Sequence, residues 1–281
     1  MKRNGLQRAR GVTLVELVVV LTLLGVMGSI GATLVGRIIA GQQDNRGRLT
    51  LAQAADGALD RVASELESAL PNSVRVTVNA AGTWIEWVPV QDAGRYRQAP
   101  DTVSGTAGDT FDPGNASDNS FDVVGTALAT PASGAQIAWA NLGTTESDVY
   151  SGSNRRAGLV VSNGGRHVNF TATTALPADA GTARFFIVGT PVTLACVTAA
   201  NGSVQLQRYS GYGWLAAQPV SAAALASATS TTLLGNLLGC SAAYGTALAN
   251  IGLLNLRVSL GDGVSGARMD LMQQLPVDNT P

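Results

Sequence analysis

An uncharged apolar segment near the N-terminus constrains this chain more than any other feature. None of the 20 residues from Leu17 to Gly36 carries a charge. At about 1.5 Å per residue, a helix of this length is about 30 Å long, which matches the hydrocarbon core of a bilayer. Residues 1–11 form a basic leader that contains Lys2, Arg3, Arg8 and Arg10. Because cationic flanks stay in the cytoplasm, we expect one membrane-spanning helix with the rest of the chain on the other side.

Glu16 is a single carboxylate that directly precedes the uncharged segment, within the same apolar stretch of sequence. A charge at a helix centre in lipid costs about 2.5–3.5 kcal/mol on insertion scales, so an intramembrane carboxylate normally has a function. A secretory signal has a shorter apolar core and a small residue after it, whereas Gly11 precedes this one. A plain membrane anchor explains the length and the basic leader, but it leaves Glu16 unexplained.

The order of basic leader, Gly11 and Val12-Thr-Leu-Val-Glu16-Leu17 resembles the class III signal of type IV pilins and type II secretion pseudopilins. The resemblance implies that a prepilin peptidase cleaves between Gly11 and Val12 and methylates the new N-terminus. It also implies that Glu16, the fifth mature residue, functions in assembly. Val12 departs from the family, which more often has Phe or Met there.

The resemblance also implies partners and a location. The partners are the prepilin peptidase, other major and minor pilins, and the inner-membrane assembly platform. The chain would cross the inner membrane once, with a periplasmic C-terminal head and an extracellular pilus as its destination on assembly.

Apolar residues continue at helical spacing after the membrane segment. They recur every three or four residues at Leu51, Ala55, Leu59, Val62, Leu66 and Leu70, which is typical of a helix with one buried face. Pro71 follows and would end the helix. We therefore predict one helix over 12–70, with a membrane half of about 12–40. Gly41 and Gly47 lie among polar residues and should weaken it locally.

The alternation of residues from Val74 onward predicts a β-rich head. Candidate strands are 74–78, 84–90, 121–124, 136–139, 158–161, 167–170, 184–188, 192–197, 203–209, 251–259 and 269–275. Asn201-Gly202 predicts a hairpin, and residues 221–230 suggest a short helix or a linker. The predicted fold class is α+β, a long N-terminal pilin helix followed by an antiparallel head over 71–281. We find no repeat and no second-domain boundary.

Short motifs in the head are similar to those of the MshO-type minor pilins of the mannose-sensitive haemagglutinin (MSHA) pilus biogenesis system. They are Leu70–Val76, Trp87–Val90, Ala93–Arg97, Ser120–Val124, Pro191–Cys196, Arg208–Tyr212 and Pro276–Pro281. The resemblance implies a minor pilin-like structural subunit that functions in assembly or initiation of the pilus. A type II secretion pseudopilin is the alternative within the wider family.

The charge balance disfavours nucleic acid as a partner. Removal of the leader takes four of the 18 cations, which leaves 14 against 19 acidic residues, or a net charge of −5. Direct binding to a phosphate backbone requires clustered cations, and the mature sequence offers none.

Cys196 and Cys240 are the two cysteines of the chain. In an oxidising periplasm a disulfide is the expected state, against two buried free thiols. Such a bridge would stabilise the head by about 4 kcal/mol on the loop-entropy account. A metal site on the cysteines is disfavoured, because His167 is the one histidine in the sequence.

Asp109, Asp112 and Asp118 are weak calcium candidates in the acidic segment 101–122. Their oxygens suit calcium, but their spacing matches no EF-hand. Aspartate and glycine are also typical of solvated turns, which is the favoured interpretation.

The sequence shows no P-loop, dinucleotide-binding or zinc motif, so we expect neither an enzyme nor a cofactor. His167 is interpreted as an ordinary strand residue. Exposed Tyr209, Tyr212 and Trp214 would suit a carbohydrate-binding adhesive tip module, a further alternative function, although such aromatic clusters more often lie in a core.

Overall fold

The computed structural model describes residues 12–102, 107–172, 174–176, 182–199, 202–248, 251–261 and 268–280. This part of the chain contains one α-helix, α1 (Leu14–Glu67), and fourteen β-strands. The chain divides into two units, the helix up to Thr50 and a unit from Leu51 onward that holds the rest of α1 and the head.

The N-terminal part of α1 is apolar and long enough to cross a membrane over Leu14–Ile39. The helix itself satisfies its hydroxyl groups, because Thr22, Ser29 and Thr33 each donate to a backbone carbonyl three residues earlier at 2.8–2.9 Å. A segment in lipid requires such internal hydrogen bonds.

Gly41 and Gly47 do not interrupt α1, which is continuous from Leu14 to Glu67. The expected local weakening is therefore not visible. A glycine costs about 1 kcal/mol in a helix interior, which is too little to break a helix that is formed on both sides.

The helix ends at Glu67 and not at the predicted Leu70. The Leu70 amide donates to the Val88 carbonyl at 2.8 Å, and the Val90 amide donates to the Ser68 carbonyl at 2.8 Å. These backbone bonds to a neighbouring segment draw residues 68–70 out of the helix, although their apolar spacing continues the helical pattern.

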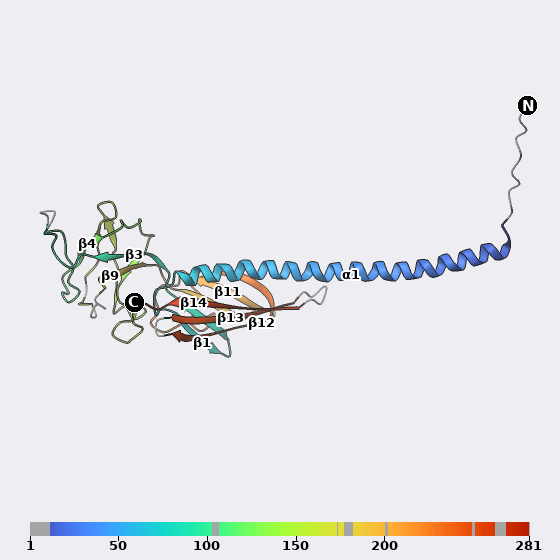
Figure 1. Ribbon diagram of the computed structural model, residues 1–281. Coiled ribbons are helices and arrows are strands. Elements are labelled where there is room, and N and C mark those ends of the chain that lie inside the picture. The colour runs from blue at the N-terminus through green and yellow to red at the C-terminus, as the bar shows by residue number, and fades with distance from the viewer. Residues whose placement is uncertain are drawn as a thin grey trace, which may run out of the picture. The chain divides into compact units, whose positions relative to one another are not determined.

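The larger β structure, the main sheet, is an antiparallel sheet of seven strands (Figure 1). Its strands are, in spatial order, β1 (Arg75–Asn79), β2 (Gly82–Trp87), β10 (Val192–Thr198), β11 (Val204–Ser210), β12 (Thr229–Leu248), β13 (Ile251–Gly261) and β14 (Arg268–Asp278). Apart from the step between β2 and β10, neighbours in the sheet are consecutive in the chain.

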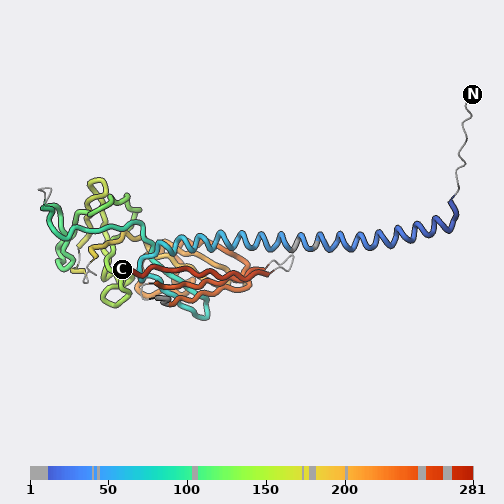
Figure 2. The backbone as a smooth tube through the Cα atoms, viewed as in Figure 1, coloured from blue at the N-terminus to red at the C-terminus, as the bar shows by residue number. Residues whose placement is uncertain are grey.

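Residues 88–190, the inserted lobe, lie between β2 and β10 in sequence and form a second seven-stranded sheet. They are the green to yellow part of the chain in Figure 2. The spatial order is β6 (Arg155–Arg156), β5 (Gln136–Ala138), β9 (Arg184–Val188), β3 (Val90–Tyr96), β4 (Ser120–Val124), β8 (His167–Asn169) and β7 (Val160–Ser162). The head thus holds two sheets within one compact unit.

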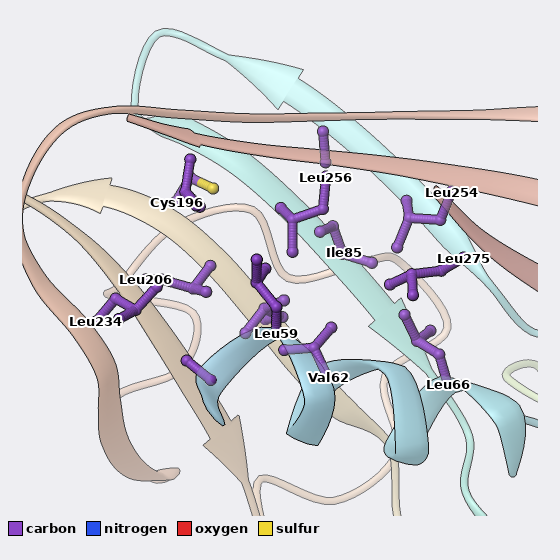
Figure 3. Packing of buried hydrophobic residues seen from close by; sticks show 14 of the residues in the cluster. Leu59, Val62, Leu66, Ile85, Cys196, Leu206, Leu234, Leu254, Leu256 and Leu275 are labelled. Atoms are coloured by element: carbon purple, nitrogen blue, oxygen red, sulfur yellow. The ribbon is translucent and has the colours of Figure 1, made fainter. Parts of the chain in front are cut away.

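The C-terminal part of α1 packs on the main sheet through the predicted apolar face. Leu59, Val62 and Leu66 are at most 5 % exposed. They meet a cluster of buried aliphatic side chains from the sheet, as Figure 3 shows for Ile85, Leu206, Leu234, Leu254, Leu256 and Leu275. Burial of each such side chain stabilises the fold by about 1.5–3 kcal/mol. An apolar N-terminal helix with an antiparallel β-rich region confirms the α+β class.

Aromatic side chains form the core of the inserted lobe. Rings of Tyr96, Phe111, Phe121, Trp139, Phe170 and Phe185 lie with centroids 5.0–6.2 Å apart. A third cluster packs Leu70, which lies between α1 and β1, against Val88, Tyr150 and Phe186 of the inserted lobe. Buried apolar contacts therefore join the inserted lobe to the segment that follows α1.

One strand prediction was wrong, and one strand was missed. The predicted strand 84–90 is two strands, because β2 ends at Trp87 and β3 begins at Val90 in the other sheet. Residues 221–228 form turns, and the 20-residue strand β12, which no candidate strand covered, begins at Thr229.

Candidate assembly site and the polar clusters of the head

Glu16 lies in the first turn of α1 and caps the helix N-terminus together with Thr13. The Glu16 amide donates to Thr13 Oγ1 at 3.3 Å, and the Thr13 amide donates back to Glu16 Oε2 at 3.4 Å. This reciprocal pair is a capping box, for which Thr-x-x-Glu is the sequence signature. The signature is present at Thr13–Glu16, and our interpretation of the sequence missed it.

The surroundings of Glu16 are open. Within the described residues no cation forms an ion pair with its carboxylate. Val12 is 71 % exposed, and Gly11, with the rest of the predicted cleavage site, lies outside the described residues. The hydrogen bonds from Thr13 therefore satisfy part of the carboxylate without neutralising it.

A disulfide joins Cys196 in β10 to Cys240 in β12, with 5.5 Å between the Cα atoms. These strands flank β11 in the main sheet. Cys196 is 4 % exposed and belongs to the core under α1. The bridge therefore fixes the sheet at the surface on which the helix packs.

The calcium candidates serve the turns of their own loop. The Asp109 carboxylate accepts from Ser120 Oγ at 2.6 Å, and the Asp118 carboxylate accepts from the Asp112 amide at 2.8 Å. Asp112 Oδ1 accepts from the Gly114 amide at 2.9 Å. Among the described residues, no group of three or more His, Cys, Asp or Glu is arranged to hold a metal ion.

His167 has partners that the sequence did not reveal. It faces Asp122 across strands β8 and β4, with 2.9 Å between Nδ1 and Asp122 Oδ1. Its Nε2 lies 3.9 Å from Asp109 Oδ2. Burial opposes ionisation of Asp122, but a hydrogen bond from the Asp109 amide, the contact with His167, and the charges of His167 and Arg97 together lower the pKa of this carboxyl.

Glu86 in β2 is the centre of a buried polar cluster. It is fully buried, and its Oε2 accepts from Arg75 Nε at 2.6 Å. Its Oε1 accepts from the Tyr212 hydroxyl at 2.8 Å, which also lies 2.8 Å from Thr193 Oγ1. Burial raises the pKa of Glu86 more than Arg75 and Tyr212 lower it.

Arg75 extends this cluster to other parts of the chain. Its guanidinium lies 3.6 Å from the ring centroid of Tyr150, a residue of the inserted lobe. It also donates to the backbone carbonyls of Leu215 and Ala216 at 3.0 and 2.7 Å. Burial raises the pKa of the Tyr150 hydroxyl well above its usual value. One arginine thus connects the main sheet, the inserted lobe and the segment after β11.

The aromatic residues that suggested sugar stacking are not exposed. Tyr209 is 6 % and Tyr212 is 9 % exposed, and both belong to a buried cluster. Trp214 is partly buried, with the Arg155 guanidinium 4.0 Å from its ring centroid. The competing interpretation, in which these rings are core residues, describes Tyr209 and Tyr212 correctly.

The comparison with family models gives one match within the N-terminal part of the chain. The model described as the prokaryotic N-terminal methylation motif matches residues 6–32. No curated protein and no solved structure matches the chain. The match supports a type IV pilin-class signal and implies processing by a prepilin peptidase and assembly with other pilins. With the apolar segment Leu14–Ile39, it is consistent with a single-pass, membrane-anchored chain of the pilin or pseudopilin type.

Proposed function

We propose that this chain is a non-enzymatic minor pilin that helps to initiate a type IV pilus of the MSHA type. The observation that carries the proposal is the N-terminal methylation motif, which covers the start of α1. The C-terminal part of the same helix packs in the core of the head, against the main sheet. Such a chain can stay in the membrane through one end of α1 and present its head to other subunits through the other.

The size of the head supports a low-copy position at the filament start. Residues 71–281 have an expected radius of gyration of about 17 Å. A subunit of the shaft packs its head against neighbours at close axial spacing, whereas the inserted lobe adds a second sheet to this head. A subunit near the tip has free space for that bulk.

Glu16 is the proposed assembly residue. Its carboxylate would pair with the methylated ammonium of Val12 on a neighbouring subunit, because from residue 12 onward the described part of its own chain supplies it with hydrogen bonds but no counter-charge. Loss of one partner of a desolvated pair leaves the other charge uncompensated, which disfavours the assembled state.

The test is the Glu16→Ala variant in cells that assemble the pilus. We expect normal insertion and cleavage but loss of the protein from sheared pili, measured by quantitative mass spectrometry. Glu67→Gln, an exposed carboxylate on the same helix, is the matched control and should be incorporated normally. Normal incorporation of Glu16→Ala would refute the pairing, and wild-type abundance equal to the major pilin would refute the initiation role. Dependence of secretion, and not of pili, on this chain would indicate the pseudopilin alternative.

A further inference from the structure

Two arginines of the inserted lobe stand directly opposite each other. Arg95 in β3 pairs with Arg184 in β9, so both side chains lie on the same face of the sheet. Arg95 is exposed and Arg184 is partly exposed. Like charges in directly opposed positions destabilise an antiparallel pair.

In the described part of the chain, no carboxylate forms an ion pair with Arg95 or Arg184. The Arg184 guanidinium lies 5.4 Å from the ring centroid of Phe186, a contact that supplies no negative charge.

Arg97, two residues after Arg95, differs from this pair because it has an acidic partner. Arg97 Nε lies 3.8 Å from Asp122 Oδ2, and Asp122 in turn contacts His167. The inserted lobe has six arginines and nine acidic residues over 88–190, a balance of 6 − 9 = −3. Among the described residues, the Arg95–Arg184 pair is therefore a local positive site in an acidic lobe, and it does not result from a general excess of cations.

A groove opens beside Arg95. It has a volume of about 480 Å³ and is lined by Arg95, Tyr96, Gln98, Val124, Thr182 and Ala183, with no carboxylate among them. Ala183 has a φ of +52°, a left-handed conformation that costs an alanine about 1–3 kcal/mol. Its carbonyl accepts the Tyr96 amide at 2.9 Å. Strain of this kind tends to occur where a binding surface must keep a fixed shape.

We propose that this groove binds the carboxylate or sulfate group of an acidic polysaccharide. The Arg95 guanidinium lines the groove and offers a fork of donors that suits such a group, and Arg184, directly opposite on the same face of the sheet, adds a second positive charge near it. Gln98 and Thr182 can exchange hydrogen bonds with sugar hydroxyls, and Val124, 48 % exposed, offers an apolar contact to a sugar ring. Nucleic acid fits less well, because it needs cations along an extended path.

The experiment uses the full-length protein in detergent micelles. Binding is measured to immobilised heparin, which carries sulfate groups, and to polygalacturonate, which carries carboxylates, at about 50 mM salt, where screening is weak. Neutral dextran and polyglutamate are the comparison ligands. We expect binding to at least one acidic polysaccharide, no binding to dextran, and a loss of about tenfold or more in Arg95→Gln/Arg184→Gln.

The matched control is Arg257→Gln/Arg268→Gln, which removes two exposed cations from the main sheet and should bind like the wild type. An equal loss in this control, absence of binding, or stronger binding to polyglutamate than to either polysaccharide would overturn the proposal. Arg95→Gln and Arg184→Gln alone should keep or raise the unfolding temperature, because each relieves a repulsion. A lower unfolding temperature would show that the arginines are structural and would also overturn it. Glu16 lies outside the groove, so a failure here leaves the assembly test independent.

Discussion

The main sheet and the inserted lobe have the same number of strands but are stabilised differently. The main sheet has strands of up to 20 residues, an aliphatic core under α1 and a disulfide. The lobe has strands of two to seven residues and an aromatic core. Its loops depend on carboxylates such as Asp109 and Asp122 that accept hydrogen bonds from the backbone and side chains. Long strands on a helix make a rigid frame, whereas short strands need dense ring packing and well-bonded loops.

The pKa of one carboxyl group is shifted in opposite directions in the two regions. Burial raises the pKa of Glu86 at the junction, whereas hydrogen bonds and nearby cations lower the pKa of Asp122 in the lobe against the effect of burial. Ionisation of Glu86 thus opposes folding, and the nearby charge of Arg75 reduces this cost. Ionisation of Asp122 favours folding.

The largest loss of stability is expected when the buried polar cluster around Glu86 is broken. Glu86→Ala leaves Arg75 without its counter-charge and Tyr212 without its acceptor, and we expect a loss of about 3–5 kcal/mol. Urea unfolding of the full-length protein, followed by tryptophan fluorescence, measures it. Asp270→Ala is the control, because its 3.8 Å pair with Arg257 is exposed and should be worth less than about 1 kcal/mol. Equal losses in the two variants would show that the buried cluster around Glu86 stabilises the fold no more than an exposed ion pair does.

Removal of the disulfide should affect one region only. Cys196→Ser/Cys240→Ser should destabilise the main sheet by about 2–4 kcal/mol, since the chain has no other cysteine. Hydrogen exchange measured by mass spectrometry should show faster exchange in β11 and β12 and unchanged exchange in β9. Faster exchange of β9 to the same degree would mean that the two regions unfold as one.

The smallest effect is expected in the lobe and depends on pH. The folded-state pKa of Asp122 is lowered from its usual 3.8, so its contribution is present above that value and is lost as pH falls through the folded-state pKa. Because the group is partly solvated, Asp122→Asn should cost less than about 1 kcal/mol at pH 7. Thermal unfolding between pH 3 and 7 should show the two proteins converging at the acidic end. A gap that widens on acidification would contradict this assignment.

The sequence predicts the helix and its buried face because the signal is local. Leu59, Val62 and Leu66 repeat at helical spacing, and the structure buries all three. The missed strand β12 contains Gly235, Gly239 and Gly245, and glycine has a low intrinsic strand preference. Pairing with β11 and β13 makes it a strand, which is a property of the sheet and not of the segment.

The polar clusters could not be predicted for a related reason. Glu86 and its partner Tyr212 are 126 residues apart in sequence, and His167 meets Asp122 only because β8 pairs with β4. The boundary at Val88 is hidden in an uninterrupted apolar run from Trp87 to Val90. The Thr13–Glu16 capping box and the turn at Asp112, by contrast, were readable from local spacing.

The step from β2 to β10 has a consequence for how such a chain can change. Trp87 and Val192 are directly opposite each other at the ends of these two strands, so the inserted lobe enters and leaves the main sheet at one point. A short turn between Trp87 and Val192 would convert β2 and β10 into an ordinary hairpin without altering the register of the other strands. The whole inserted lobe can therefore be exchanged or removed at this one point, while α1 and the other strands of the main sheet stay the same.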